Sequence, residues 1–327
     1  MTRRYGMTVP FAGPLVDQAE RFRALVDLGY TDAWTAESDG YDGLTPLALA
    51  SIWAPELRLG TAILPVFTRG PALLAQSAAS MAAAAPGRFV LGIGSSSSVI
   101  VERWNGMDFE APFARVRDTI RFLRAAFTGE KVTESFESFD IAGFRLGNTP
   151  VTPPQIVVAA LREGMIRLAG READGVVVNW LSVEDAATVT GLVREAASVA
   201  GRPEPEVIAR LFVCPSTDRE TVVAQARRLV AAYVNVPVYR AFHEWMGRTQ
   251  LLSEHWERWD AGDRSGSLVA IPEEVVDDLL VHGSAEECRM HIERYMAAGI
   301  TTPVLSIVPL AGVDTDAAIR ELAPNRI

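Results

Sequence analysis

Two apolar segments of this chain end in glycines or small polar residues, a pattern that can bring a ligand close to the backbone. The first is Leu57–Pro65, LRLGTAILP, and the second, one predicted helix later, is Arg88–Ser98, RFVLGIGSSSS. Runs that are apolar at successive positions are typical of parallel strands covered on both faces. Small residues at the ends of such strands let a flat ring or a phosphate group approach. We therefore expect both segments to end at a binding site.

A third segment combines small residues with the start of a predicted helix. Ala159–Gly164 reads AALREG and follows an apolar run. The first N–H groups of a helix have no partner within the helix, so they can bind a phosphate group, and Arg162 would add a charged contact. The segment lacks a glycine-rich fingerprint, so an ordinary turn between a strand and a helix is the alternative.

Strands and helices alternate along the whole chain, and this alternation predicts the scaffold that positions these segments. The expected strands are Tyr5–Val9, Asp32–Thr35, Arg58–Leu64, Phe89–Ile93, Ile156–Val158, Gly175–Val178, Val207–Val213 and Pro303–Ile307. The expected helices are Leu15–Leu28, Thr45–Trp53, Pro71–Ala84, Phe113–Phe127, Gly164–Ala169, Val183–Ala200, Arg219–Tyr233 and Ala285–Ala298. This pattern predicts an α/β fold, a single (β/α)8 TIM barrel, whose reactive residues lie at the carboxyl ends of its strands.

Two longer connections interrupt the alternation and are expected as insertions in one domain spanning residues 1–327. Residues 131–152 alternate polar and apolar side chains, which predicts a hairpin. Residues 234–280 are rich in aromatic side chains and too long for a structureless loop, so extra helices are expected there. The aromatic residues between Tyr239 and Trp259 either cover the substrate as a lid or pack the inserted helices together.

Composition argues against several classes of function. The 327 residues include 31 Lys and Arg against 41 Asp and Glu, and the net charge of −10 disfavours binding to nucleic acid or to an anionic membrane. No apolar run approaches the roughly 20 residues that span a bilayer, and no signal peptide is evident. Cys214 and Cys288 lie far apart without metal-ligand spacing, so we expect no metal site and a cytoplasmic protein with reduced thiols.

The order and spacing of four segments resemble the luciferase-like monooxygenase superfamily. They read LGTAILP, GRFVLGIGSSSS, PPQIVVAALREGMIRLAGREADGVVVNW and VDDLLVHGSAEECRMHIERYMAAGITTPVL, and the similarity extends over essentially the whole chain. Within the superfamily, the chain looks most like the oxidoreductases that use coenzyme F420, a deazaflavin. The resemblance implies an enzyme, often a homodimer, whose barrel holds a flavin or deazaflavin at the carboxyl ends of its strands.

The resemblance also implies roles for individual residues. Ala62–Ile63 correspond to a non-prolyl cis peptide that supports the ring of the cofactor. The remaining cofactor contacts are expected at Ser95, Ser96, Ala159, Ala160, Leu161, Arg162, Gly164 and Val178. The substrate is expected at Met7, Trp34, Asn179 and Trp180, with burial in the core as the alternative for these side chains.

The segment WTAESDGYDG departs from better-known F420 enzymes. Some that oxidise sugars or alcohols carry an acidic residue followed by a histidine base where this chain has Glu37 and Ser38, and a further acidic residue where it has Ser97. A serine cannot replace a histidine base near neutral pH without a partner. Glu37 and Ser38 remain the catalytic candidates, and Glu37 is otherwise a hydrogen-bond partner of the ring or a solvated carboxylate.

The expected function is therefore F420-dependent hydride transfer between the deazaflavin and a small organic substrate. Reduction of an activated C=C or C=N bond fits the missing base better than oxidation of an alcohol. Two alternatives stay open: an FMN-dependent monooxygenase that receives reduced flavin from a partner reductase, and a flavin-binding barrel without catalysis.

Overall fold

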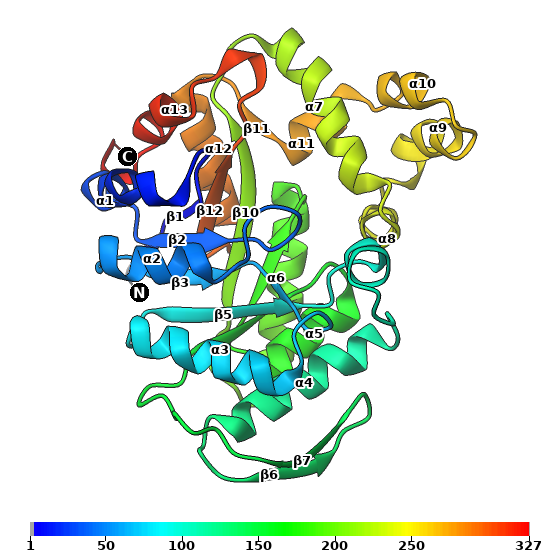
Figure 1. Ribbon diagram of the computed structural model, residues 1–327. Coiled ribbons are helices and arrows are strands. Elements are labelled where there is room, and N and C mark those ends of the chain that lie inside the picture. Colours follow the sequence, from blue (N-terminus) through cyan, green and yellow to red (C-terminus); the bar gives the residue numbers. More distant parts are fainter. Residues whose placement is uncertain (1–2, 327) are drawn as a thin grey trace.

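In the computed structural model, which describes residues 3–326, parallel strands close into a barrel (Figure 1). The order around the barrel is β1-β2-β3-β5-β8-β9-β10-β12, and β12 pairs with β1 to close it. The barrel strands are β1 (Gly6–Thr8), β2 (Asp32–Thr35), β3 (Arg58–Thr61), β5 (Phe89–Gly94), β8 (Gln155–Ala159), β9 (Gly175–Asn179), β10 (Glu206–Cys214) and β12 (Thr302–Ile307). This confirms the predicted TIM barrel.

Helices follow the strands and cover the outside of the barrel. They are α1 (Ala19–Asp27), α2 (Thr45–Trp53), α3 (Pro71–Ala84), α4 (Pro112–Ala126), α5 (Glu163–Glu172), α6 (Val183–Val199), α7 (Arg219–Val234), α12 (Ala285–Ala297) and α13 (Thr315–Glu321). Two of them begin with reciprocal caps, in which Ser182 and Ser284 exchange hydrogen bonds with Asp185 and Glu287. Within residues 3–326, no helix is long and apolar enough to cross a bilayer.

The predicted strand Arg58–Leu64 is interrupted before its end. β3 stops at Thr61, and β4 (Leu64–Pro65) pairs separately with β5. The Thr61 hydroxyl accepts a hydrogen bond from Gly92 N and donates one to Gly92 O, both at 2.9 Å, so a side chain replaces backbone pairing at this point. Only glycine fits opposite, because a Cβ at Gly92 would lie 1.8 Å from the Thr61 carbonyl oxygen.

An apolar cluster fills the middle of the barrel. Trp34, at 1% exposure, is its largest side chain, and a Cβ at Gly60 would lie 2.3 Å from the Trp34 ring. Glycine on β3 therefore makes room for a large aromatic side chain on β2, in a barrel interior that is packed rather than hollow. The other buried members are Val90, Val157, Val177, Ile208 and Val304.

Below this cluster, charged side chains close the amino-terminal end of the barrel. Arg58 donates hydrogen bonds to Asp32 and, at 2.8 and 2.6 Å, to both carboxylate oxygens of Glu206. Thr302 donates a further hydrogen bond to Glu206. Although burial acts to raise the pKa of Glu206, the hydrogen bonds and charge of Arg58 outweigh it and lower that pKa below its ordinary value.

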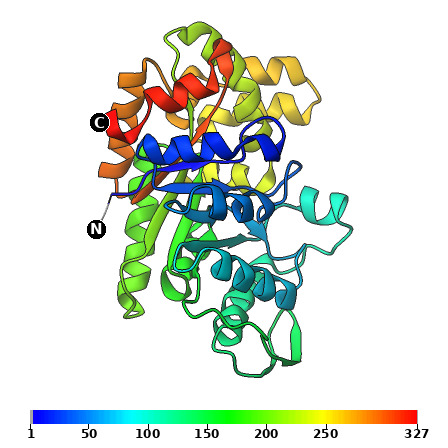
Figure 2. The same ribbon diagram turned by 60° about the vertical axis from the view of Figure 1, so that its left-hand side comes forward.

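Further elements lie between α4 and β8 and between α7 and β12. The first of these segments contains the antiparallel hairpin of β6 (Val132–Ser135) and β7 (Asp140–Phe144). The second contains α8 (Pro237–Trp245), α9 (Thr249–Asp260), α10 (Arg264–Val269) and α11 (Glu273–Leu279), and it leads into β11 (Val281–His282). Figures 1 and 2 both show the hairpin at the opposite end of the molecule from α9 and α10.

Candidate active site

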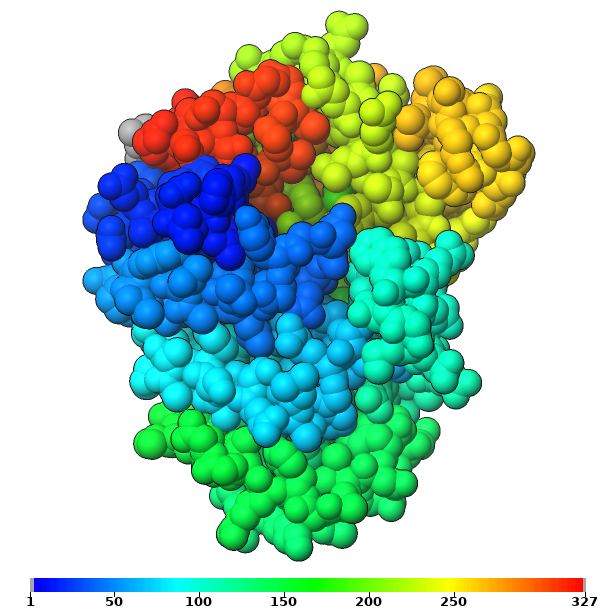
Figure 3. All heavy atoms as spheres, viewed as in Figure 1, coloured from blue at the N-terminus to red at the C-terminus, as the bar shows by residue number. Residues whose placement is uncertain are grey.

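Polar and small side chains lie beyond the apolar cluster, at the carboxyl ends of the strands. Side chains two residues apart on a strand point to the same face. Asn179 on β9 therefore faces the barrel interior above Val177, and Arg210 on β10 does so above Ile208. Figure 3 shows a hollow on this face, bordered by the blue N-terminal, red C-terminal and yellow-green segments. We call this inward-facing region the barrel mouth.

One side of the barrel mouth is lined by small residues from three neighbouring strands. Ala62 follows β3, Gly94 ends β5 and Ala159 ends β8. A Cβ at Gly94 would lie 3.0 Å from the Ala159 Cβ and 3.2 Å from the side chain of Ile63, so any larger residue there would fill the space. Ala62 and Ile63 are half-buried, and the peptide bond between them is cis. We call Ala62, Ile63, Gly94 and Ala159 the cradle.

The segments next to the cradle offer polar groups. Ser95 and Ser96 are half-buried, and Ser96 adopts a left-handed backbone with φ of 64°. Helix α5 begins after Arg162, whose backbone is extended, and no side chain caps its first N–H groups. Leu161 is half-buried, whereas Arg162 and Gly164 are exposed. An uncapped helix start beside the cradle can bind an anionic group.

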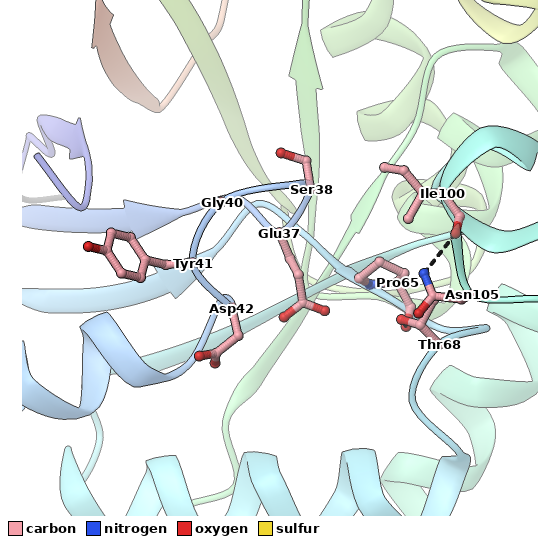
Figure 4. Close-up of a pocket in the computed structure, with 9 residues that line it drawn as sticks. All are labelled: Glu37, Ser38, Gly40, Tyr41, Asp42, Pro65, Thr68, Ile100 and Asn105. Atoms are coloured by element: carbon pink, nitrogen blue, oxygen red, sulfur yellow. Dashed lines mark hydrogen bonds between the residues drawn. The ribbon is translucent and has the colours of Figure 1, made fainter. Parts of the chain in front are cut away.

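Glu37 and Ser38 lie at the rim, where they do not form an acid–base pair. Glu37 Oε2 accepts hydrogen bonds from Gly43 N at 2.8 Å and from Arg69 Nη2 at 2.7 Å. The Ser38 hydroxyl is exposed and donates to Asp39 at 2.9 Å. Figure 4 shows the Glu37 carboxylate and the Ser38 hydroxyl pointing in opposite directions. They line a pocket of about 220 Å³ together with Gly40, Tyr41, Asp42, Pro65, Thr68, Ile100 and Asn105.

Three residues expected at the site have side chains on the other face of their strands. Met7, at 1% exposure, and Val178 belong to the core between the barrel and its helices. The Ala160 side chain lies in the same core, and its N–H already donates to the Val177 carbonyl at 3.1 Å. These side chains point away from the barrel mouth because adjacent strand positions face opposite ways, and only the alternate positions face the mouth.

Two tryptophans expected at the substrate are core residues. Trp34 lies in the apolar cluster beneath the barrel mouth. Trp180, also at 1% exposure, has a left-handed backbone with φ of 52° and stacks on Phe212 with a ring separation of 4.1 Å. Both side chains are therefore buried in the core, which was the alternative to substrate contact. Asn179 is half-buried and accepts a hydrogen bond from the Tyr239 hydroxyl at 3.1 Å, which links α8 to β9.

Sequence reasoning missed Arg210, the charged side chain at the barrel mouth. Its Nη2 donates to the Ser306 hydroxyl at 3.2 Å, while its Nε is buried without a hydrogen-bond partner among the described residues. Burial lowers the pKa of Arg210 below its ordinary value. The sequence feature that could have identified it is a lone arginine in the middle of the otherwise apolar run VIARLFVC.

Comparison of the chain with known proteins identifies its family. The family described as luciferase-like monooxygenase matches residues 2–302. A Mycobacterium tuberculosis protein provisionally named a coenzyme F420-dependent oxidoreductase is 28% identical, covering 90% of this chain and 92% of its own. The 5,10-methylenetetrahydromethanopterin reductase of Methanolobus tindarius is 24% identical, covering 91% and 92%.

Solved structures show the same fold. The coenzyme F420-dependent tetrahydromethanopterin reductase of Methanopyrus kandleri superposes with a TM-score of 0.82 at 20% identity, covering 99% of this chain and 98% of its own. The chain therefore belongs to the luciferase-like monooxygenase family, with relatives among its F420-dependent oxidoreductases.

Proposed function

We propose that this protein is a coenzyme F420-dependent oxidoreductase that transfers a hydride between the deazaflavin and a small organic substrate. The observation that carries the proposal is the cradle, a surface of small residues on three adjacent strand ends beside an uncapped helix. The similarity to named F420-dependent enzymes over nine-tenths of the chain supports this choice of cofactor.

The residues present fit such a cofactor. A flat ring needs a surface without protruding side chains, and Ala62, Gly94 and Ala159 supply one. A phosphate-bearing tail needs N–H donors, which Ser95, Ser96 and the start of α5 offer, with Arg162 adjacent. When bound, the deazaflavin supplies or accepts the hydride, while the protein supplies binding and orientation.

The rest of the barrel mouth orients the substrate and limits the reaction. Tyr239 and Asn179 form a hydrogen-bonded wall, and the buried Trp180 packs behind it against Phe212. Neither Glu37, paired with Arg69, nor the exposed Ser38 is placed as a base. Reduction of an activated C=C or C=N bond is therefore favoured: the carbon gains the hydride, and the adjoining atom gains a proton from solvent.

The experiment is a single-turnover assay with reduced F420 and a series of enones and imines. Oxidation of the cofactor with stoichiometric formation of reduced product is expected. Reduced FMN with oxygen forms the second arm, because monooxygenases occur in the same family. Product that contains oxygen from O₂, formed only with FMN, would contradict the proposal.

A further inference from the structure

Arg210 keeps an uncompensated positive charge at the barrel mouth. Among the described residues, no carboxylate lies within ion-pair distance of its guanidinium. Burying a cation without a counter-charge is costly, and proteins usually pair such groups. Arg248, another arginine of the interior, follows that rule, because Asp185 lies 2.7 Å and Asp278 3.3 Å from its guanidinium.

The groups around Arg210 are neutral. Asn179 and Val304 are its register partners on β9 and β12, and its guanidinium carbon lies 5.0 Å from the centre of the Phe212 ring. Within residues 3–326, its one hydrogen bond goes to the Ser306 hydroxyl, and the Tyr239 hydroxyl donates to Asn179. Nothing in this surrounding neutralises the cation, so the charge is available to a molecule that enters the mouth.

The position of Arg210 separates it from the cradle. Around the barrel, β10 stands four places from β3, and β12 stands four places from β5. Arg210 and Ser306 therefore lie across the barrel mouth from Ala62 and Gly94. A molecule between a ring on the cradle and this wall would meet the guanidinium and the hydroxyl on its far side.

We propose that Arg210 and Ser306 form a binding site for a carboxylate of the substrate. Arg210 is half-buried, its planar guanidinium matches a carboxylate in shape and charge, and the guanidinium and the Ser306 hydroxyl can donate to the carboxylate oxygens. The inference rests on the proposed function and narrows its substrate class to small organic acids that carry a C=C or C=N bond. The carboxylate anchors the acid while the unsaturated carbon faces the cradle.

The test compares acids with their matched neutral amides in the F420-loaded protein. Calorimetric titration would use the series formate, acetate, benzoate and cinnamate, each paired with its amide. We expect the wild-type protein to bind at least one acid about tenfold more tightly than its amide, because charged hydrogen bonds are worth more than neutral ones. Arg210→Met should abolish this preference, and Ser306→Ala should reduce it.

Control variants distinguish loss of the carboxylate site from misfolding and from loss of the cofactor. Arg210→Met should leave F420 affinity unchanged, and its melting temperature should match or exceed that of the wild type, which excludes misfolding. The matched variant Arg23→Met, at an exposed position on α1, should keep the preference for acids. Equal binding of acids and amides by the wild type would overturn the proposal, as would loss of F420 affinity in Arg210→Met. If the wild type does not bind F420 at all, the proposed function fails, and acid binding to the cofactor-free protein still decides the role of Arg210.

Discussion

Two arginines occupy inward positions at opposite ends of the barrel, and they are treated in opposite ways. Arg58, at the amino-terminal end of β3, is fully paired by Asp32 and Glu206. Arg210, towards the carboxyl-terminal end of β10, makes a single hydrogen bond, to a neutral hydroxyl, in the part of the chain that the structure describes. Glu206 lies on the same strand as Arg210, four residues away, yet its carboxylate serves Arg58. We call Arg58, Asp32 and Glu206 the floor of the barrel. The comparison shows a floor whose charges are paired with one another and a barrel mouth whose cation has no counter-charge and can bind a ligand.

The largest predicted effect is on stability at the floor. Arg58→Met leaves Asp32 and Glu206 buried without their cation, which should cost about 3–5 kcal/mol of unfolding free energy. Arg210→Met removes an unpaired cation and should cost nothing or stabilise. Urea unfolding at neutral pH measures both. Equal losses for the two variants would remove the distinction between floor and mouth.

A packing test gives the next largest effect. Gly60→Ala places a Cβ 2.3 Å from Trp34, and overpacking of this kind should cost about 1–3 kcal/mol. The matched substitution Gly40→Ala, at the rim, meets no atom within 4 Å and should be nearly neutral. Thermal unfolding compares the pair. A neutral Gly60→Ala would show that the apolar cluster around Trp34 accommodates an added methyl group.

The floor should also respond to acid. The folded pKa of Glu206 is lowered from 4.5, so its contribution to stability is fully present above that value and is lost as the pH falls through the folded pKa. Urea unfolding from about pH 6 to about pH 3 should show a steeper loss for the wild type than for Glu206→Gln. If the free energy of unfolding falls equally with pH in the two proteins, Glu206 does not contribute to the loss of stability in acid.

The smallest effects are expected at the rim. Glu37→Gln weakens an ion pair with Arg69 that is partly exposed, so the loss of stability should be about 1 kcal/mol or less. Ser38→Ala should change neither stability nor turnover, and Glu37→Gln should change turnover by about twofold or less, because neither residue acts as a base. A loss of a hundredfold in turnover for either variant would restore it as a catalytic residue.

The order of strands and helices was predictable from the sequence because the patterns that mark these elements are local. Apolar strand runs alternating with helices predict the barrel, and small residues after them predict the ligand-binding end. The interruption of the strand after Thr61 was harder to predict, since it depends on hydrogen bonds between Thr61 and Gly92, which are far apart in the chain. The division of Leu15–Leu28 into a short turn and α1 also differs from the prediction, because the Gln18 side chain bonds to the Phe11 backbone instead of continuing the helix.

The site was predictable only in part, for a geometric reason. A strand end can be located in the sequence, but the face that meets the ligand depends on how the barrel closes. Met7 and Val178 lie on strands that lead to the site, but their side chains point to the helices. Arg210 could not be identified from the sequence because what distinguishes it is the absence of a counter-charge. Ion pairs in this barrel join residues as distant as Arg58 and Glu206, so the sequence does not show which arginine is unpaired.

The cradle is the part of the account that one measurement tests most directly. Oxidised F420 would be titrated calorimetrically into the wild type, Gly94→Val and Gly147→Val, where Gly147 is an exposed glycine with open space around it. We predict equal binding by the wild type and Gly147→Val, and at least about tenfold weaker binding by a folded Gly94→Val, whose side chain fills the space beside Ile63 and Ala159. Equal affinity of all three proteins, or no binding by the wild type, would contradict the account.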